Sequence, residues 1–238
     1  MNEAAVRLGL SELASNHSVT LARFGNRQSQ LLEVAGLLTA AQHYRVMGYD
    51  VEPRNLQGGL FRSKVTTSPY PQRYSYFEVA RNDASFEIHS NMPVKGAYPL
   101  PTAAYVVDVA VIRSGLLPPA NVRCTIESSA LITFAEIKSL VVYPMLLAQF
   151  VGIVHEVTPR FLTGRVPYGF HRDGHFRPAL ITIEHLRPSS AEIIDAFPTR
   201  GFRVTICPGL DNFVARRGWQ TSTESILADR VSVPKNTV

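Results

Sequence analysis

The chain has 238 residues, 45% of them hydrophobic, which is enough for one domain with a core of its own. Its 24 lysines and arginines exceed its 19 acids, and the resulting charge of +5 is compatible with a polyanionic partner without identifying one. The longest apolar region, residues 140–154, is interrupted by Pro144, Gln149 and Gly152, which excludes a membrane span. The N-terminus lacks the pattern of a signal peptide, and there are two cysteines, so we expect a cytoplasmic protein.

The N-terminal quarter of the chain predicts two helices. Residues 3–14 have the apolar spacing of a short amphipathic helix and would form an N-terminal helical arm, 1–25, that packs on the body or on a second subunit. Residues 26–47 predict a stronger helix that ends at Gly48. Glu33 is the one acid in its apolar stretch, and the simplest interpretation places it on the solvent face.

Extended segments follow the second helix. An extended region starts at residues 49–55, and the pattern predicts strands at 61–67, 74–80 and 85–90. The last two are expected to form a hairpin around the turn residues 81–84. Glu87 and His89 share one face of the last strand, where we expect a polar pair on the open side of the sheet. Residues 91–102 contain three prolines and predict a loop.

Two apolar strands in the middle of the chain carry charges. Residues 103–112 form a mainly β-branched run with the single acid Asp108, which needs either a structural partner or a ligand. Residues 131–138 form a second strand in which Glu136 and Lys138, two apart, point to the same side. An isolated Glu-x-Lys pair is usually a solvated ion pair, and the acid on the other strand is what makes the pattern unusual.

The remaining elements are a buried helix, a long connection and a strand–helix–strand run. Pro144 suits the first turn of a helix at 145–157, which is apolar nearly all round. Residues 158–178 mix basic and aromatic side chains, and we expect either a nucleic-acid contact loop or a partner-binding or flexible loop. A strand at 179–185, a helix at 189–197 and a strand at 202–207 complete the domain. Four arginines of the mixed segment are the candidate nucleic-acid contacts: Arg160, Arg165, Arg172 and Arg177.

The two charged strands, VVDVAVI and FAEIKSL, resemble the PD-(D/E)XK nuclease superfamily. The resemblance covers residues 28–207 in its order of elements and three positions in its specific residues. It implies an α/β fold, a restriction-endonuclease-like mixed central sheet flanked by helices, with an added antiparallel hairpin. The nuclease-like domain would span residues 26–210 and be followed by a C-terminal extension, 211–238.

The resemblance also implies the chemistry. Asp108 and Glu136 would bind Mg²⁺, or Mn²⁺, with the Ile137 carbonyl as a further oxygen ligand. Lys138 would orient the attacking water or help to deprotonate it, or neutralise the phosphate. In some branches of the superfamily the helix before the sheet adds a glutamate to the metal site, which would be Glu33. In others a glutamine on the helix after the sheet supports the site or contacts nucleic acid, which would be Gln149.

The expected activity is metal-dependent hydrolysis of DNA phosphodiester bonds. No target-reading domain is recognisable, which favours a nuclease subunit that works with other protein subunits or as a homo-oligomer, for example in antiviral defence. The alternative with the same fold is a catalytically silent subunit that binds nucleic acid or scaffolds a complex. An unrelated α/β enzyme and a structural subunit that assembles through residues 140–154 are the other interpretations, and no further catalytic motif favours a specific one.

Overall fold

The structure is a computed structural model that describes residues 28–64, 68–98, 104–164 and 173–210, with 11, 15, 20–21, 170 and 227. Its helices, in chain order, are α2 (Gln28–Val46), α3 (Pro144–Val157) and α4 (Pro188–Asp195), with short 3-10 turns η1 (Pro71–Arg73) and η2 (Pro159–Phe161). Its strands are β1 (Thr20–Leu21), β2 (Asp50–Arg54), β3 (Leu60–Phe61), β4 (Tyr76–Arg81), β5 (Ala84–Lys95), β6 (Ala104–Arg113), β7 (Leu131–Lys138), β8 (Ala179–Thr182) and β9 (Thr205–Cys207).

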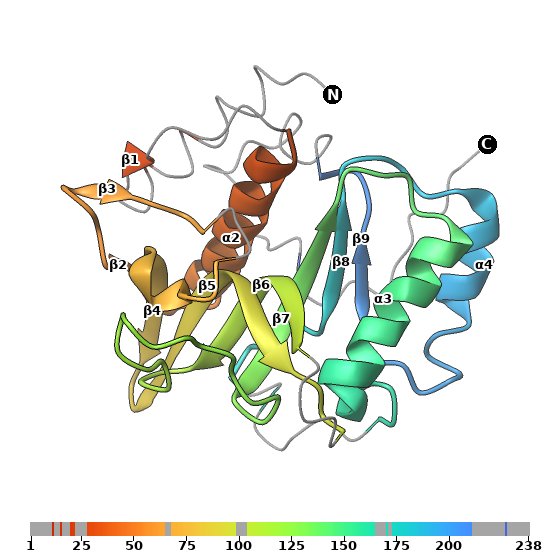
Figure 1. Cartoon of the computed structure of the whole chain (residues 1–238). Coiled ribbons are helices and arrows are strands. Elements are labelled where there is room, and N and C mark those ends of the chain that lie inside the picture. Colours follow the sequence, from red (N-terminus) through yellow and green to blue (C-terminus); the bar gives the residue numbers. More distant parts are fainter. Residues whose placement is uncertain are drawn as a thin grey trace.

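A seven-stranded sheet in the order β2-β4-β5-β6-β7-β8-β9 forms the centre of the fold (Figure 1). Its pairs are antiparallel from β2 to β7, and β7, β8 and β9 then run parallel. The chain is therefore a mixed α/β protein with a mostly antiparallel sheet. The predicted hairpin is confirmed as β4–β5, and both of its strands belong to the central sheet. The finer restriction-endonuclease-like arrangement stays a prediction.

Helices on the two faces of the sheet enclose two hydrophobic cores (Figure 1). The first core lies between α2 and sheet residues such as Ile88, Val109 and Ile137. The second lies between α3 and residues of the other side, such as Phe134 and Leu180. Because adjacent strand residues point to opposite faces, β6 and β7 contribute alternately to both cores.

The predicted helices form, with differences at their ends. α2 is followed by Gly48 at φ +81°, a conformation that glycine adopts freely, which confirms the predicted stop. α3 begins at Pro144, as predicted. It is not buried all round, since Met145 is 61% exposed. α4 begins without a side-chain cap, because Arg187 at its N-cap position has no side-chain acceptor; the Ser190 hydroxyl in the first turn donates to the Val142 carbonyl.

The predicted strands differ most at β5. β7 has the predicted bounds, whereas β5 continues to Lys95 through residues that predicted a loop. Pro93 is tolerated there because β4 no longer pairs beyond Ile88, so this half of β5 has one full-length neighbour, β6. In the connection between β6 and β7, Ile126 forms an isolated bridge with Val94.

The ends of the chain lie mostly outside the described residues. Of the predicted arm, 1–25, the structure describes Ser11, Ser15 and β1, which pairs in parallel with β3. Of the predicted C-terminal extension, 211–238, it describes Leu227.

None of the helices in the described part of the chain combines the length and apolar character that a membrane crossing requires.

A glycine lets α2 approach the strand that carries the charged pair. A Cβ atom added at Gly36 would lie 1.8 Å from Ile137 Cδ1 and 2.8 Å from Ile137 Cγ1. Ile137 is buried on the α2 side of β7. The close packing at Gly36 therefore fixes the distance between α2 and the strand segment 136–138.

We expect Gly36→Ala to lower the free energy of unfolding by about 1 to 3 kcal/mol, because the new methyl group overpacks the α2 core. Gly152→Ala on α3 is the matched control. A Cβ there meets nothing within 4 Å, and alanine favours a helix by about 0.5 to 1 kcal/mol. Urea unfolding of the two variants measures both effects, and a stabilised Gly36→Ala protein would contradict the packing argument.

Candidate functional site

Asp108, Glu136 and Lys138 meet and form what we call the carboxylate–lysine site. Lys138 Nζ lies 3.0 Å from Asp108 Oδ2 and 2.8 Å from Glu136 Oε2. The backbone N–H of Ile137 also donates to Asp108 Oδ2, over 2.7 Å. The three charged side chains that sequence reasoning singled out are therefore in direct contact.

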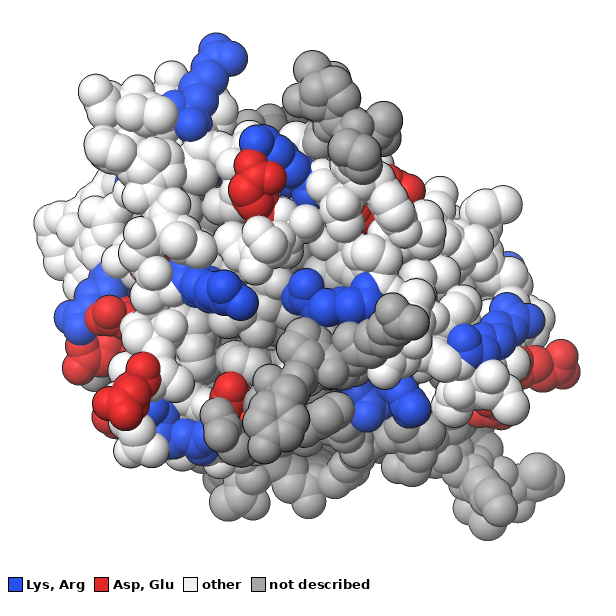
Figure 2. All heavy atoms as spheres, turned by 90° about the horizontal axis from the view of Figure 1, so that it is seen from below, with Lys and Arg blue, Asp and Glu red and all other residues white. Residues whose placement is uncertain are grey.

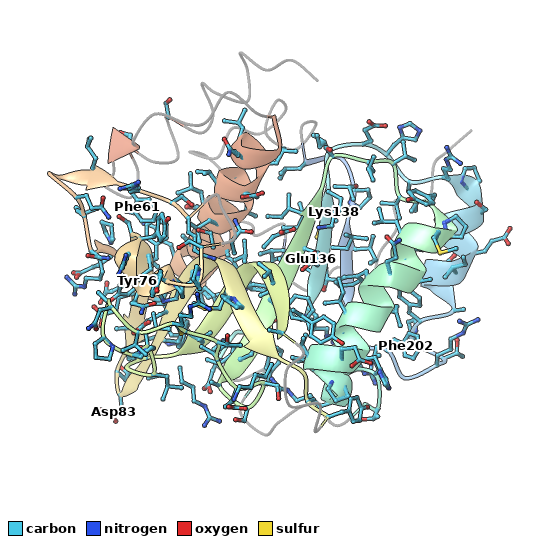
Figure 3. All side chains as sticks on the ribbon, viewed as in Figure 1. Phe61, Tyr76, Asp83, Glu136, Lys138 and Phe202 are labelled. Carbon is cyan, nitrogen blue, oxygen red and sulfur yellow. The ribbon has the colours of Figure 1, made fainter. Side chains whose placement is uncertain are left out.

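Strand pairing explains why the three residues converge. β6 and β7 are antiparallel, and the pairing of Val109 with Ala135 places Asp108 opposite Glu136 one step further on. Lys138 is two residues beyond Glu136 and shares its face. Glu136 and Lys138 lie together on β7, between α2 and α3 in the view of Figure 3. The site thus follows from the register of two central strands.

Burial raises the free energy of the charged side chains at this site. The side chain of Glu136 is only 4% exposed, and burial together with the nearby Asp108 raises its pKa to about 7. Burial alone would lower the pKa of Lys138, but the attraction of Glu136 and Asp108 outweighs it and raises that pKa above its ordinary value. Lys138 therefore stays protonated at neutral pH, while Glu136 is close to its titration point.

Glu33 lies within electrostatic range of the site but is held by another residue. Asn91 Nδ2 donates to Glu33 Oε2 over 2.7 Å. Burial, offset in part by this hydrogen bond, raises the pKa of Glu33, and Asp108 raises it further. The helix expected to approach the site does approach it, and its glutamate faces Asn91. A role for Glu33 as a metal ligand stays a prediction.

The oxygens of the site fit a divalent ion in part. Glu136 Oε1 is buried and has no hydrogen-bond partner, and a buried polar atom of this kind calls for a water or an ion. Both hydrogen bonds of Asp108 end at Oδ2, so Oδ1 is the oxygen left for a ligand. Two carboxylates are enough for Mg²⁺, which keeps several of its waters. Within the described residues, no group of three or more His, Cys, Asp or Glu side chains is placed to hold a metal.

Ile137 enters the site through its backbone. Its side chain points away from the two carboxylates into the α2 core, whereas its N–H group faces Asp108. The metal-binding role implied for its carbonyl stays a prediction.

The structure describes three of the five proposed nucleic-acid contacts, Gln149, Arg160 and Arg177. Gln149 is exposed on α3, and in the described part of the chain it has no hydrogen bond to the carboxylates or to Lys138. Arg160 donates to the Leu131 and Ile132 carbonyls, at the other end of β7, which gives it a structural role. Arg177 is half-buried, and the remaining two candidates, Arg165 and Arg172, lie outside the described residues.

The aromatic side chains of the basic segment belong largely to the cores. Phe161, Phe170 and Phe176 are all buried, so they are not available to stack on bases. His175 Nδ1 lies 2.9 Å from the Tyr44 hydroxyl, and burial lowers the pKa of His175 to about 4. At these positions the composition of the segment therefore reflects core packing, with Phe161 and Phe170 in the α3 core and Phe176 in the α2 core, rather than a stacking platform.

Sequence reasoning misjudged a second polar cluster on β5. Glu87 and His89 are buried, not on an open face, and His89 Nε2 lies 2.8 Å from Glu87 Oε2. Glu87 also accepts from the Gly115 N–H, and the His89 ring stacks on Tyr76. The connection after β6 covers this pair, which a pattern of alternating residues could not indicate.

Figure 2 shows that on the face seen from below Figure 1 the basic side chains are interspersed with acids and do not form one positive field.

No protein-family model, curated protein or solved structure matches the chain. The geometry of the carboxylate–lysine site is therefore the main evidence on function.

The raised pKa of Glu136 predicts that the stability of the protein depends on pH in a specific way. Because its pKa is about 7 in the folded protein and about 4.5 ordinarily, the folded state binds more protons between these values and loses stability as the pH rises through them. Glutamine does not titrate. We expect the free energy of unfolding of Glu136→Gln, relative to wild type, to rise by about 1 to 3 kcal/mol between pH 4.5 and 8.

Urea unfolding in the presence of EDTA measures this difference, since a chelator removes any contribution of metal binding. The other titrating groups are common to both proteins and cancel. A difference that does not change with pH would show that Glu136 is not desolvated as the structure indicates.

Proposed function

We propose that the chain is a metal-dependent nuclease that hydrolyses DNA phosphodiester bonds at the carboxylate–lysine site. The observation that carries this proposal is the contact of Lys138 with both Asp108 and Glu136 beside a buried carboxylate oxygen that lacks a partner. The residue types and their order on two adjacent strands are those of the PD-(D/E)XK pattern. DNA as the substrate rests on the resemblance to that superfamily.

The residues present suit the proposed chemistry. Asp108 and Glu136 would hold Mg²⁺ or Mn²⁺, which supplies an activated water and charge stabilisation when bound. Lys138 keeps its proton at neutral pH, so it acts by stabilising negative charge on the attacked phosphate and not as a base. The Ile137 N–H fixes the orientation of the Asp108 carboxylate. In the reaction a water oxygen bonds to phosphorus as one P–O ester bond breaks.

A catalytically silent subunit is the second candidate, and one observation favours it. The Lys138 ammonium already pairs with both carboxylates, so the cluster is also consistent with a structural ion-pair network. A silent subunit would use this fold to bind nucleic acid or to scaffold a complex. The two candidates differ in whether the carboxylates bind a metal.

The proposal is tested by digesting plasmid and single-stranded DNA with and without Mg²⁺ or Mn²⁺. We expect metal-dependent cleavage by the wild type and a loss of at least about a hundred-fold in Lys138→Ala, because the ammonium that stabilises the negative charge on the phosphate is removed. Asp108→Asn should lose cleavage together with Mn²⁺ binding, since one ligand charge is removed.

Lys95→Ala is the matched control. This lysine is exposed and pairs with Glu127 at the end of β5, and its loss should leave cleavage unchanged. Cleavage that persists in Lys138→Ala would reject the assigned centre. Absence of both cleavage and Mn²⁺ binding in the wild type would favour the silent subunit.

A further inference from the structure

Lys64 is a buried lysine that the proposed chemistry does not use. It lies just after β3 and is 1% exposed. Its Nζ donates to the Asn91 carbonyl, and among the described residues it has no carboxylate within ion-pair distance. A buried ammonium without a carboxylate partner is costly. This free-energy cost suggests that Lys64 has a role that an apolar side chain could not fill.

Segment 63–64 holds residues 90–91 of β5 by four contacts, which we call the clamp. Besides the Nζ contact, the Lys64 N–H donates to Ser90 Oγ and the Lys64 carbonyl accepts from Asn91 Nδ2. The Ser63 and Ser90 hydroxyls lie 2.9 Å apart. The clamp therefore fixes both the backbone and the side chain of Asn91.

Asn91 is the point at which the side chains of β5 change the face of the sheet on which they lie. Its φ is +51°, a left-handed conformation that is unusual inside a strand. On β5, Ile88 belongs to the α2 core, but Met92, also even-numbered, belongs to the α3 core. We call this change of side the kink.

The kink lies directly beside Asp108. Pairing of β5 with β6 keeps one register on both sides, from Ser90 with Val109 to Met92 with Val107, so Asn91 stands opposite Asp108. β6 changes core at the same point, since Val109 packs with α2 and Val107 with α3. Asp108 is thereby placed at the junction of the two cores, where its carboxylate reaches Ile137 and Lys138.

Other ionisable groups surround Lys64. Glu33 faces it from α2, His89 from β5 and Cys124 from the connection after β6. Burial lowers the pKa of Lys64 to about 8, and Glu33 opposes this effect. Because Asn91 Nδ2 also donates to Glu33, the clamp connects α2 to β5 next to the site.

We propose that Lys64 is a positioning residue of the carboxylate–lysine site, which holds the kink at Asn91 and through it the placement of Asp108. Its effect on cleavage rests on the proposed function, whereas its effect on the placement of Asp108 does not. Lys64 is too deeply buried to touch DNA. It therefore acts through Asn91 and Asp108 and not on the substrate.

Lys64→Met tests the proposal, because methionine fills a similar volume without the donor. We expect the purified variant to fold, to bind Mn²⁺ about 10- to 100-fold more weakly and to lose kcat by a similar factor, with the KM for DNA unchanged. Hydrogen exchange of the Ile137 amide, which donates to Asp108, should become faster. Lys95→Met, which removes an exposed lysine at the end of β5, should leave all four quantities unchanged.

Two further variants separate the parts of the clamp. Asn91→Gly keeps the kink, since glycine adopts this φ freely, and keeps the backbone carbonyl that Lys64 Nζ contacts. It removes the amide that donates to Glu33 and to the Lys64 carbonyl, and Ile137 exchange should stay as in the wild type. Ser90→Ala removes one hydroxyl from the clamp and should change Mn²⁺ binding and Ile137 exchange in the direction of Lys64→Met. If Lys64→Met does not fold, Ser90→Ala tests the positioning role in its place.

The outcomes are distinct. Wild-type Mn²⁺ affinity, kcat and Ile137 exchange in folded Lys64→Met, or in Ser90→Ala if it replaces that variant, would overturn the positioning role. If the wild type neither cuts DNA nor binds Mn²⁺, the proposed function fails. Faster Ile137 exchange in the variant would then still support the clamp, and unchanged exchange would reject it.

Discussion

The site depends on one constraint, the antiparallel pairing of β6 with β7. This pairing places Asp108 opposite Glu136 and lets the Ile137 N–H and the Lys138 ammonium reach the same Asp108 oxygen. A slip of one residue would turn Glu136 and Lys138 toward the α2 core and bring Ile137 to the other face. The hydrophobic alternation of β7 prevents this slip, because Ala135 and Ile137 pack under α2 while Phe134 packs under α3. Core packing and the placement of charge are thus set by the same register.

Burying the charged side chains around Asp108 lowers the stability of the fold. Glu136 and Lys64 are both buried. Burial raises the pKa of Glu136 and lowers the pKa of Lys64, so it favours the uncharged form of each side chain. A network made only for stability would be replaced at little cost by apolar side chains. The two charges lie on either side of Asp108, one on the neighbouring strand and the other holding β5 at Asn91. Their concentration around one aspartate is what distinguishes this region from the ordinary surface ion pairs, such as that of Arg54 with Glu52.

Helix α2 contributes to the site indirectly. Gly36 allows the helix to approach Ile137, so the strand segment with Glu136 and Lys138 is held from its far side. Glu33, three residues earlier, connects the helix to the kink through Asn91. The helix thus supports β7 at one point and β5 at another, the two strands that flank Asp108.

The sequence by itself determined the elements whose cause is local. The apolar run with Asp108, the alternation of β7 and the proline at the start of α3 predict their strands and helix closely, because periodicity and proline act within a few residues. It also singled out the three charged residues that meet. Only the tertiary structure decided what surrounds them. Lys64 and Asn91 lie 27 positions apart and meet through the fold, so neither signals its role in its own segment. Phe161, Phe170 and Phe176 gave the wrong impression for the same reason, since composition does not show whether a ring faces the core or the solvent.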